Sequence, residues 1–109
     1  MTNLSVVERF IHAVENKQEE ILKEIVSDDY KFFIHIDDKV LSKRDLIGWC
    51  LSDSFTRSRS RIIYENEEIG VEHTFVTFAN GTTPEAVLSV HRIEGGKIVS
   101  TETGATALQ

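Results

Sequence analysis

V-T-F-A-N-G-T-T-P-E-A-V-L-S-V-H-R-I-E-G-G-K-I-V-S-T-E-T-G-A, residues 76–105, is the stretch that decides the fold. Two turn signals divide it into three strands. Asn80 and Gly81 form a strong hairpin signal, because a type I′ turn needs a positive φ angle at both central residues. Gly95 and Gly96 meet the same requirement further along the chain. The stretch therefore predicts three consecutive antiparallel strands.

Upstream of this stretch, the sequence predicts three helices and further strands. Apolar residues recur at spacings of three and four from residue 4 to residue 15, which is typical of an amphipathic helix. Three residue pairs have capping-box spacing and mark helix starts: Ser5 with Glu8, Asn16 with Glu19, and Ser42 with Asp45. Asn3 is an equally good cap for the first helix. The predicted elements are helices at 4–15, 17–26 and 43–55, and strands at 30–36, 57–65, 69–79, 84–93 and 97–105.

The hairpin turns predict which side chains share a face of the sheet. Two-residue loops at 67–68, 80–81 and 95–96 set the register, and four-residue loops give the same faces. One face is mostly apolar, so the helices are expected to pack there; it includes Ile62, Tyr64, Val71, His73, Phe75, Leu88, Val90, Thr101 and Thr103. The other face is mixed; it includes Arg57, Arg59, Arg61, Glu72, Val76, Phe78, Val87, His91, Ile93 and Ile98. Its apolar members would form an exposed patch that a homodimer, packed sheet to sheet, would cover.

Composition narrows the class of protein. A length of 109 residues predicts a single domain, residues 1–109. The net charge of −6 argues against nucleic acid and anionic membranes as partners. The lone Cys50 fits a reducing compartment and reads as a small buried hydrophobe rather than a catalytic thiolate. With no apolar run long enough for a membrane helix and no signal-peptide pattern, a cytoplasmic location is expected.

The order helix, helix, strand, helix and four-strand meander resembles the nuclear transport factor 2-like superfamily, in particular its SnoaL-like and ketosteroid-isomerase-like domains. Residues 22–32 (L-K-E-I-V-S-D-D-Y-K-F), the helix start at 42–49, and residues 91–100 (H-R-I-E-G-G-K-I-V-S) carry this resemblance. It implies an α+β fold shaped like a cone, in which a strongly curved antiparallel sheet wraps around the N-terminal helices and a pocket opens between helices and sheet. Members include isomerases, cyclases, dehydratases, epoxide hydrolases and binding modules, and many are homodimers, so the fold alone does not decide function.

The chain departs from the catalytic patterns of enzymatic relatives. Such relatives commonly place a carboxylate at the end of the first strand, where this chain has His35 followed by Asp37. Cyclase-like members often have histidine and aspartate in the last strand, where this chain has Thr101 and Thr103. The tyrosine of a steroid isomerase's first helix is replaced by apolar residues around Phe10. No known catalytic set carries over from the resemblance.

Two histidines are the candidate catalytic residues. His73 lies mid-strand on the predicted core face, where it could polarise a ligand carbonyl or act as a base, or be a core histidine satisfied by a neighbour. His35 lies near the base position of the relatives, and Asp37 on the same side could orient its ring and raise its pKa. The alternative for His35 is a strand residue beside a solvated turn.

The candidate ligand-binding residues are Trp49, Tyr30, Tyr64, Thr101 and Thr103. Trp49 could supply an aromatic wall or simply pack in the core, and the tyrosines could donate hydroxyl hydrogen bonds. The guanidinium groups of Arg57, Arg59 and Arg61 are expected to share the outer face, binding an acidic partner or pairing with Glu72, Glu85 or a second copy. No set of residues has metal-ligand spacing, and no cofactor is expected.

These features predict a domain that binds a small organic ligand in a mainly apolar pocket. If it is an enzyme, the expected chemistry is cofactor-free acid–base isomerisation, cyclisation or dehydration, with a histidine as base and a hydroxyl group as oxyanion donor. The alternative is a non-catalytic, dimeric interaction module that uses the outer sheet face. A closed pocket of roughly 300 Å³ or more with two converging polar side chains favours the first interpretation, and a pocket filled by Trp49 and phenylalanine side chains favours the second.

Overall fold

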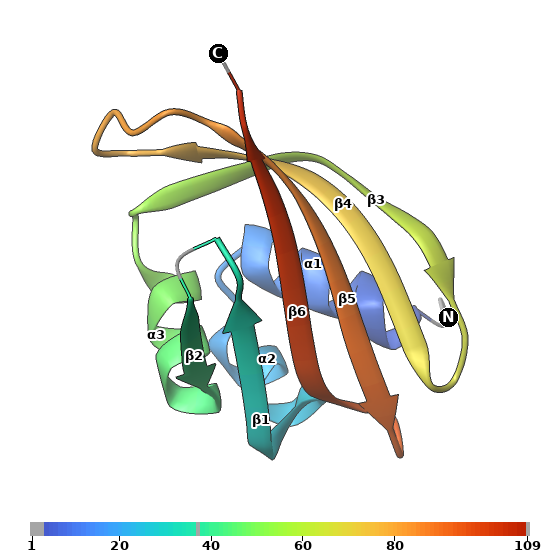
Figure 1. Cartoon of the computed structure of the whole chain (residues 1–109). Coiled ribbons are helices and arrows are strands. Elements are labelled where there is room, and N and C mark those ends of the chain that lie inside the picture. The colour runs from blue at the N-terminus through green and yellow to red at the C-terminus, as the bar shows by residue number, and fades with distance from the viewer. Residues whose placement is uncertain (1–3, 37, 109) are drawn as a thin grey trace.

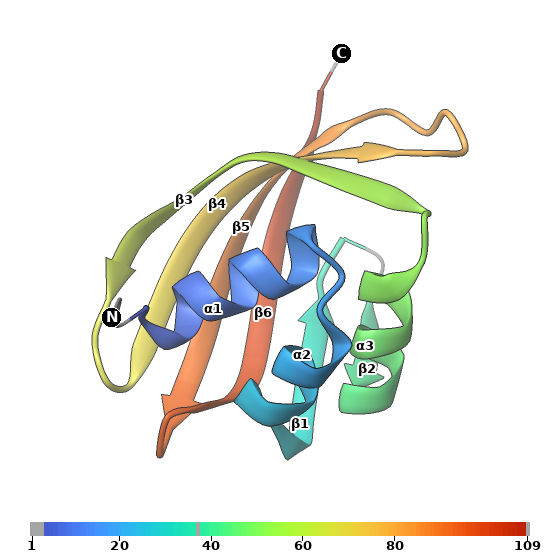
Figure 2. The same ribbon diagram turned by 180° about the vertical axis from the view of Figure 1, so that it is seen from behind.

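The computed structural model describes residues 4–36 and 38–108, which form three helices on one side of a curved, six-stranded sheet (Figures 1 and 2). In chain order the elements are α1 (Val6–Glu15), α2 (Glu19–Ile25), β1 (Val26–Ile34), β2 (Lys39–Ser42), α3 (Lys43–Leu51), β3 (Phe55–Glu65), β4 (Ile69–Phe78), β5 (Glu85–Glu94) and β6 (Lys97–Ala107). The strand order is β2-β1-β6-β5-β4-β3. Every neighbouring pair is antiparallel except β1 and β6, which run parallel. The predicted α+β class and curved sheet are confirmed.

The helices cover the concave side of the sheet, which we call the inner face, and leave the convex outer face uncovered by helices. Figure 2 shows α1 lying obliquely across β3 to β6, with α2 and α3 beside β1 and β2. The core lies between these layers and includes Val7, Phe10, Leu22, Ile25, Val26, Leu46, Ile47, Ile93 and Ile98. Gly70 in β4 permits a close approach of α1, because a Cβ atom there would collide with the Val7 side chain. Within the described ranges, no helix is long and apolar enough to span a membrane.

Two of the three predicted helix caps are confirmed. Ser5 accepts the backbone N–H of Glu8 at 3.1 Å, and the Glu8 carboxylate accepts the N–H of Ser5 at 3.1 Å. Ser42 and Asp45 form the same reciprocal pair at the start of α3. The alternative cap Asn3 lies outside the described residues.

The third predicted cap is wrong, and several element boundaries differ from the prediction, including the start of β1, which lies at Val26 rather than at residue 30. Asn16 ends α1 instead of starting α2: its backbone N–H donates to His12, and the N-cap of α2 is Gln18, whose side chain makes no capping hydrogen bond. Helix α3 ends at Leu51 rather than at residue 55, since Ser52 caps its last turn and Phe55 already pairs in β3. The segment after residue 38, predicted as part of a turn, forms β2.

The predicted assignment of the two sheet faces is wrong. The β4–β5 register is as predicted, with His73 opposite Leu88, but Leu88 is 42% exposed. The mixed face is the one that the helices cover: its buried members include Glu72, Thr74, Val76, Ser89, His91, Ile93 and Ile98. A mixed face can be buried when its polar groups hydrogen-bond to one another, as they do here. The predicted exposed patch of Val76, Phe78, Val87, Ile93 and Ile98 therefore points inward.

Two β-bulges change which residues point inward compared with the alternation that the hairpin turns alone predict. A register shift after Arg92 sets Thr101, rather than Ser100, beside His91, so Thr101 shares the inner face with His91. In β3 a second shift surrounds Arg59, whose φ angle is +51°. Because a bulge inserts an extra residue, it reverses the alternation beyond it. The predicted common face of the three arginines is wrong for this reason: Arg57 points inward and Arg59 lies over the outer-face ring of Phe75 at 4.0 Å.

Candidate functional site

A cavity of about 140 Å³ lies between the inner face of the sheet and helices α1 and α3. Apolar and aromatic side chains form most of its wall, and polar side chains from four neighbouring strands meet on its sheet side. The lining includes Phe10, Val14, Tyr30, Phe32, Trp49, Cys50, Phe55, Arg57, Glu72, Thr74, Val76, Glu85, Val87, Ser89, His91, Thr101 and Thr103. It is smaller than the roughly 300 Å³ expected of an ordinary ligand pocket, yet the expected convergence of polar groups is present.

Four polar side chains form a continuous hydrogen-bonded row across β3, β4, β5 and β6; we call Arg57, Glu72, His91 and Thr101 the inner polar cluster. One oxygen of Glu72 pairs with the Arg57 guanidinium, and the other lies 2.6 Å from His91 Nε2. His91 Nδ1 lies 2.7 Å from Thr101 Oγ1. Glu72 and His91 are each 1% exposed, so these bonds form almost entirely out of water.

The pairing keeps Glu72 ionised. Burial would raise the pKa of its carboxyl group, but the His91 hydrogen bond and the nearby Arg57 charge outweigh burial and lower that pKa. An ionised carboxylate only accepts hydrogen bonds, so His91 donates to it through Nε2. In the neutral imidazole, Nδ1 is then an acceptor for the Thr101 hydroxyl. The cluster thus holds His91 in one orientation and one tautomer.

Tyr30 lines the cavity, and its hydroxyl group is buried without a hydrogen-bond partner among the described residues. The side chain comes from β1 and is 2% exposed, and its hydroxyl group makes no hydrogen bond. Burial raises the pKa of Tyr30, and the Thr101 hydroxyl nearby offsets this only in part. The phenol therefore stays protonated at neutral pH and keeps a hydrogen that it can donate.

Aromatic rings also line the cavity. Trp49 stacks on Phe55 with ring centroids 4.2 Å apart and lies 6.3 Å from Phe32. Phe10 of α1 packs edge-on against the imidazole of His91 at 5.0 Å. Burial raises the pKa of the Cys50 thiol to about 12, so this cavity-lining cysteine is a neutral, apolar neighbour and not a thiolate.

Several solved structures superpose on this chain over most of its length. A protein of unknown function from Cytophaga hutchinsonii, described as NTF2-like, superposes with a TM-score of 0.77 at 15% identity, over 97% of this chain and 95% of that one. A proposed ketosteroid isomerase from Kribbella flavida superposes with a TM-score of 0.79 at 6% identity, over 95% of this chain and 77% of that one. IdmH, a proposed polyketide cyclase from Streptomyces antibioticus, superposes with a TM-score of 0.71 at 13% identity, over 92% of this chain and 88% of that one.

The chain has the nuclear transport factor 2-like fold. By sequence, no family model and no curated protein matches it. At these identities the likeness confirms the predicted fold and carries no activity.

Four of the seven predicted site residues line the cavity of this NTF2-like fold: Tyr30, Trp49, Thr101 and Thr103. His73 does not, because it lies on the outer face, with its ring 5.1 Å from Phe75. The side chain of His35 is 62% exposed and its Nε2 lies 3.0 Å from Glu102 Oε1; Asp37, its expected partner, is outside the described residues. Tyr64 is 56% exposed.

Sequence reasoning missed Arg57, Glu72 and His91 as site residues, although it had grouped all three on one face. The pattern that could have indicated a site is an arginine, a glutamate and a histidine on the same face of three adjacent strands. Three such side chains can form ion pairs in solvent or a hydrogen-bonded network in the core. The pattern of apolar residues in the sequence favoured ion pairs in solvent. Within the part of the chain that the structure describes, no three His, Cys, Asp or Glu side chains are grouped to hold a metal ion.

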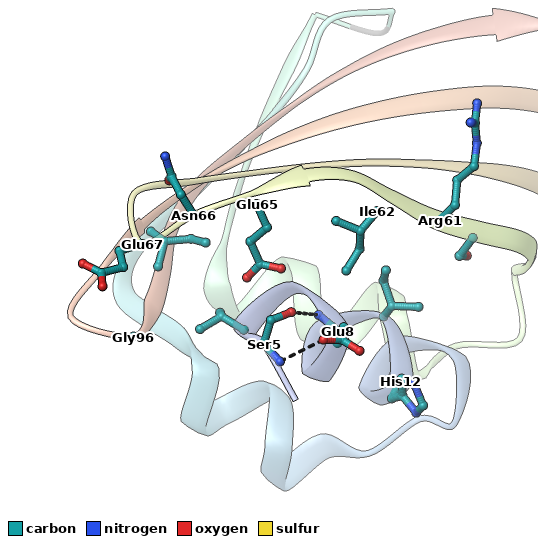
Figure 3. Close-up of a pocket in the computed structure, with 13 residues that line it drawn as sticks. Ser5, Glu8, His12, Arg61, Ile62, Glu65, Asn66, Glu67 and Gly96 are labelled. Carbon is teal, nitrogen blue, oxygen red and sulfur yellow. Dashed lines mark hydrogen bonds between the residues drawn. The ribbon is translucent and has the colours of Figure 1, made fainter. Parts of the chain in front are cut away.

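A second, wider hollow lies between α1 and β3 (Figure 3) and measures about 860 Å³. It is an open groove whose polar side chains support local structure. Ser5 and Glu8 form the capping box drawn in Figure 3, and Glu65 accepts the backbone N–H of Val7 at 3.3 Å. Because its groups are exposed or already paired, this groove is the weaker candidate for specific recognition.

Proposed function

We propose that this chain binds a small organic molecule in the inner cavity, with a polar atom of the ligand directed at Tyr30. The observation that carries the proposal is the hydroxyl group of Tyr30, a cavity-lining residue, which is buried without a hydrogen-bond partner among the described residues. A buried polar group left unpaired costs about 1–3 kcal/mol, and a ligand oxygen that accepts its hydrogen bond would recover this energy. The apolar walls supply the remaining contact area.

Proton transfer is the chemistry that the cavity supports best. The Tyr30 phenol can donate to a carbonyl oxygen, which stabilises the negative charge that develops when a neighbouring C–H is deprotonated. His91 can accept that proton at Nδ1 once Thr101 rotates away, and Glu72 stabilises the imidazolium that forms. Return of the proton to another carbon completes an isomerisation that needs no cofactor. His91 thus takes the role that the sequence had assigned to His73.

A thermal-shift screen of small ketones, aldehydes and lactones tests the binding proposal. The compounds that raise the Tm of the wild type are repeated on Tyr30→Phe and, as a matched control on the outer face, on His73→Ala. We expect the ligand-induced shift to shrink in Tyr30→Phe and to persist in His73→Ala. The reverse pattern would move the site to the outer face, and a screen without any stabilising compound would overturn the proposal.

Exchange of carbon-bound protons for deuterium tests the chemistry. A ketone found in the screen is followed by proton NMR in D₂O with the wild type, His91→Gln, Thr101→Val and His73→Gln. Enzyme-dependent exchange next to the carbonyl group is expected in the wild type and in His73→Gln, and is expected to be lost in His91→Gln. Thr101→Val should change the rate while keeping His91. Exchange at the background rate with the wild type would restrict the proposal to binding.

A second candidate function is a protein interface on the outer face. Apolar side chains remain open there: Leu88 is 42% and Tyr64 is 56% exposed, and Val71, Phe75 and Val90 are half-buried. A second copy of this chain packed on the face would cover them. Light scattering at micromolar concentration is expected to give a dimeric mass that Leu88→Lys reduces to a monomeric one. A monomeric wild type would remove this candidate.

A further inference from the structure

The size, charge and hydrogen bonding of the inner cavity narrow its ligand to one chemical class, an inference that rests on the proposed function. We propose that the cavity takes a neutral molecule with a single six-membered ring that carries one hydrogen-bond acceptor, such as a cyclic ketone. Three independent features of the cavity support this class.

The first feature is volume. At about 140 Å³ the cavity is close to an engineered cavity of about 150 Å³ that holds one benzene molecule. It is less than half of the lower limit, about 300 Å³, for pockets that take drug-sized ligands. Phe10, Leu46 and Cys50 are at most 6% exposed and belong to the core cluster, so the wall cannot retreat without loss of packing elsewhere. The volume therefore matches a single ring better than two fused rings.

The second feature is charge. Glu72 neutralises Arg57 inside the cluster, so neither offers a free charge to a ligand. The half-buried Glu85 also lines the cavity and adds a negative charge. A carboxylate ligand would therefore enter a lining of net negative charge without a free cation to meet it. This arrangement favours a neutral ligand.

The third feature is the direction of the available hydrogen bond. Tyr30 offers a donor, whereas the Thr101 hydroxyl is engaged by His91. The complementary ligand atom is an acceptor, and an ammonium group cannot supply one. The rings of Trp49, Phe32 and Phe55 suit the body of a ring-shaped ligand. A ring carbonyl satisfies both the donor and the walls.

NMR titration of the isotope-labelled protein tests this class with three probes: cyclohexanone, the two-ring ketone 2-decalone, and the anion cyclohexanecarboxylate. Cyclohexanone is expected to shift the amide signals of cavity-lining residues with a Kd in the millimolar range, as its few heavy atoms allow. We expect the other two probes to bind at least about tenfold more weakly. Normally the larger apolar surface of 2-decalone would strengthen binding, so the expected order is specific to a cavity of limited size.

Two tyrosine variants test the acceptor. Tyr30→Phe is expected to weaken cyclohexanone binding roughly fivefold to tenfold, the effect of one hydrogen bond. Tyr64→Phe, the same chemical change outside the cavity, should leave the Kd unchanged. Equal Kd values for Tyr30→Phe and the wild type would overturn the acceptor argument.

The failures of the two proposals are distinguishable. If 2-decalone binds as tightly as cyclohexanone, the single-ring limit is wrong while the binding site stands. Preferred binding of the carboxylate would overturn the charge argument in the same way. If no probe shifts the cavity signals, and the wider screen of ketones, aldehydes and lactones also yields no ligand, both the class and the proposed function are overturned.

Discussion

Glu72→Leu is expected to destabilise the protein by about 3–5 kcal/mol. The substitution removes the carboxylate that compensates Arg57, whose side chain is only 8% exposed, and leaves a buried cation without a partner. It also removes the acceptor of His91 Nε2. These losses overlap because they belong to one network, so they do not simply add. Since domains are stable by only about 5–15 kcal/mol, the variant should lie near the limit of folding.

Urea unfolding followed by the fluorescence of Trp49, the only tryptophan, measures this cost. A double-mutant cycle with Arg57→Met separates the ion pair from general damage. Removal of both charges leaves no uncompensated ion, so Arg57→Met/Glu72→Leu should recover roughly 2 kcal/mol or more relative to Glu72→Leu. Glu72→Gln is the shape-matched control, because an amide oxygen still accepts a hydrogen bond.

Two results would refute this reasoning. A loss below about 1 kcal/mol in Glu72→Leu is the value of an exposed pair, and it would place the cluster in solvent. Additive effects in the double variant would show that Arg57 and Glu72 do not interact.

Three further predictions concern the pKa of Glu72, the packing at Gly70 and the hydroxyl group of Tyr30. The folded-state pKa of Glu72 lies below the ordinary value of 4.5, so as the pH falls the unfolded chain takes up a proton at this carboxylate before the folded protein does. The stability that ionised Glu72 contributes is therefore present above about pH 4.5 and is lost as the pH falls further. Urea midpoints measured between pH 7 and pH 3 should fall less steeply for Glu72→Gln than for the wild type. Gly70→Ala should lower the free energy of unfolding by about 1–3 kcal/mol, because the added Cβ would collide with Val7. Gly48→Ala, at an exposed helix position with open space around it, should raise the free energy of unfolding by about 0.5–1 kcal/mol. Equal effects of the two substitutions in thermal unfolding would contradict the packing of α1 on β4. Tyr30→Phe should leave the free energy of unfolding unchanged or raise it by up to about 1 kcal/mol, because the lost hydroxyl has no partner, and a clear loss of stability would reveal one.

Local signals in the sequence predicted the elements well because they depend on neighbouring residues. The capping boxes at Ser5 and Ser42 and the glycine turn before Lys97 need only a few adjacent side chains, and they lie where predicted. The order of these elements was sufficient for the resemblance to the NTF2-like fold. Asn16 shows the limit, because the same residue type serves either end of a helix and tertiary contacts chose the end of α1.

The site was harder to predict because it depends on which face the helices choose. Counting apolar residues favoured the face with His73 and Leu88, but a network that satisfies Arg57, Glu72 and His91 removes most of the cost of burying the other face. The bulge that aligns His91 with Thr101 leaves no mark in a sequence read by strict alternation. Tyr30, Trp49, Thr101 and Thr103 were placed at the cavity because the resemblance located the first and last strands and α3.

The most direct test of the account is the set of intermolecular nuclear Overhauser effects between bound cyclohexanone and the protein's aromatic protons. We predict contacts from the ring protons of the ligand to Tyr30 and Trp49, which both line the inner cavity. Contacts to His73 or Tyr64 on the outer face, without any to Tyr30, would contradict both the assignment of the faces and the proposed site.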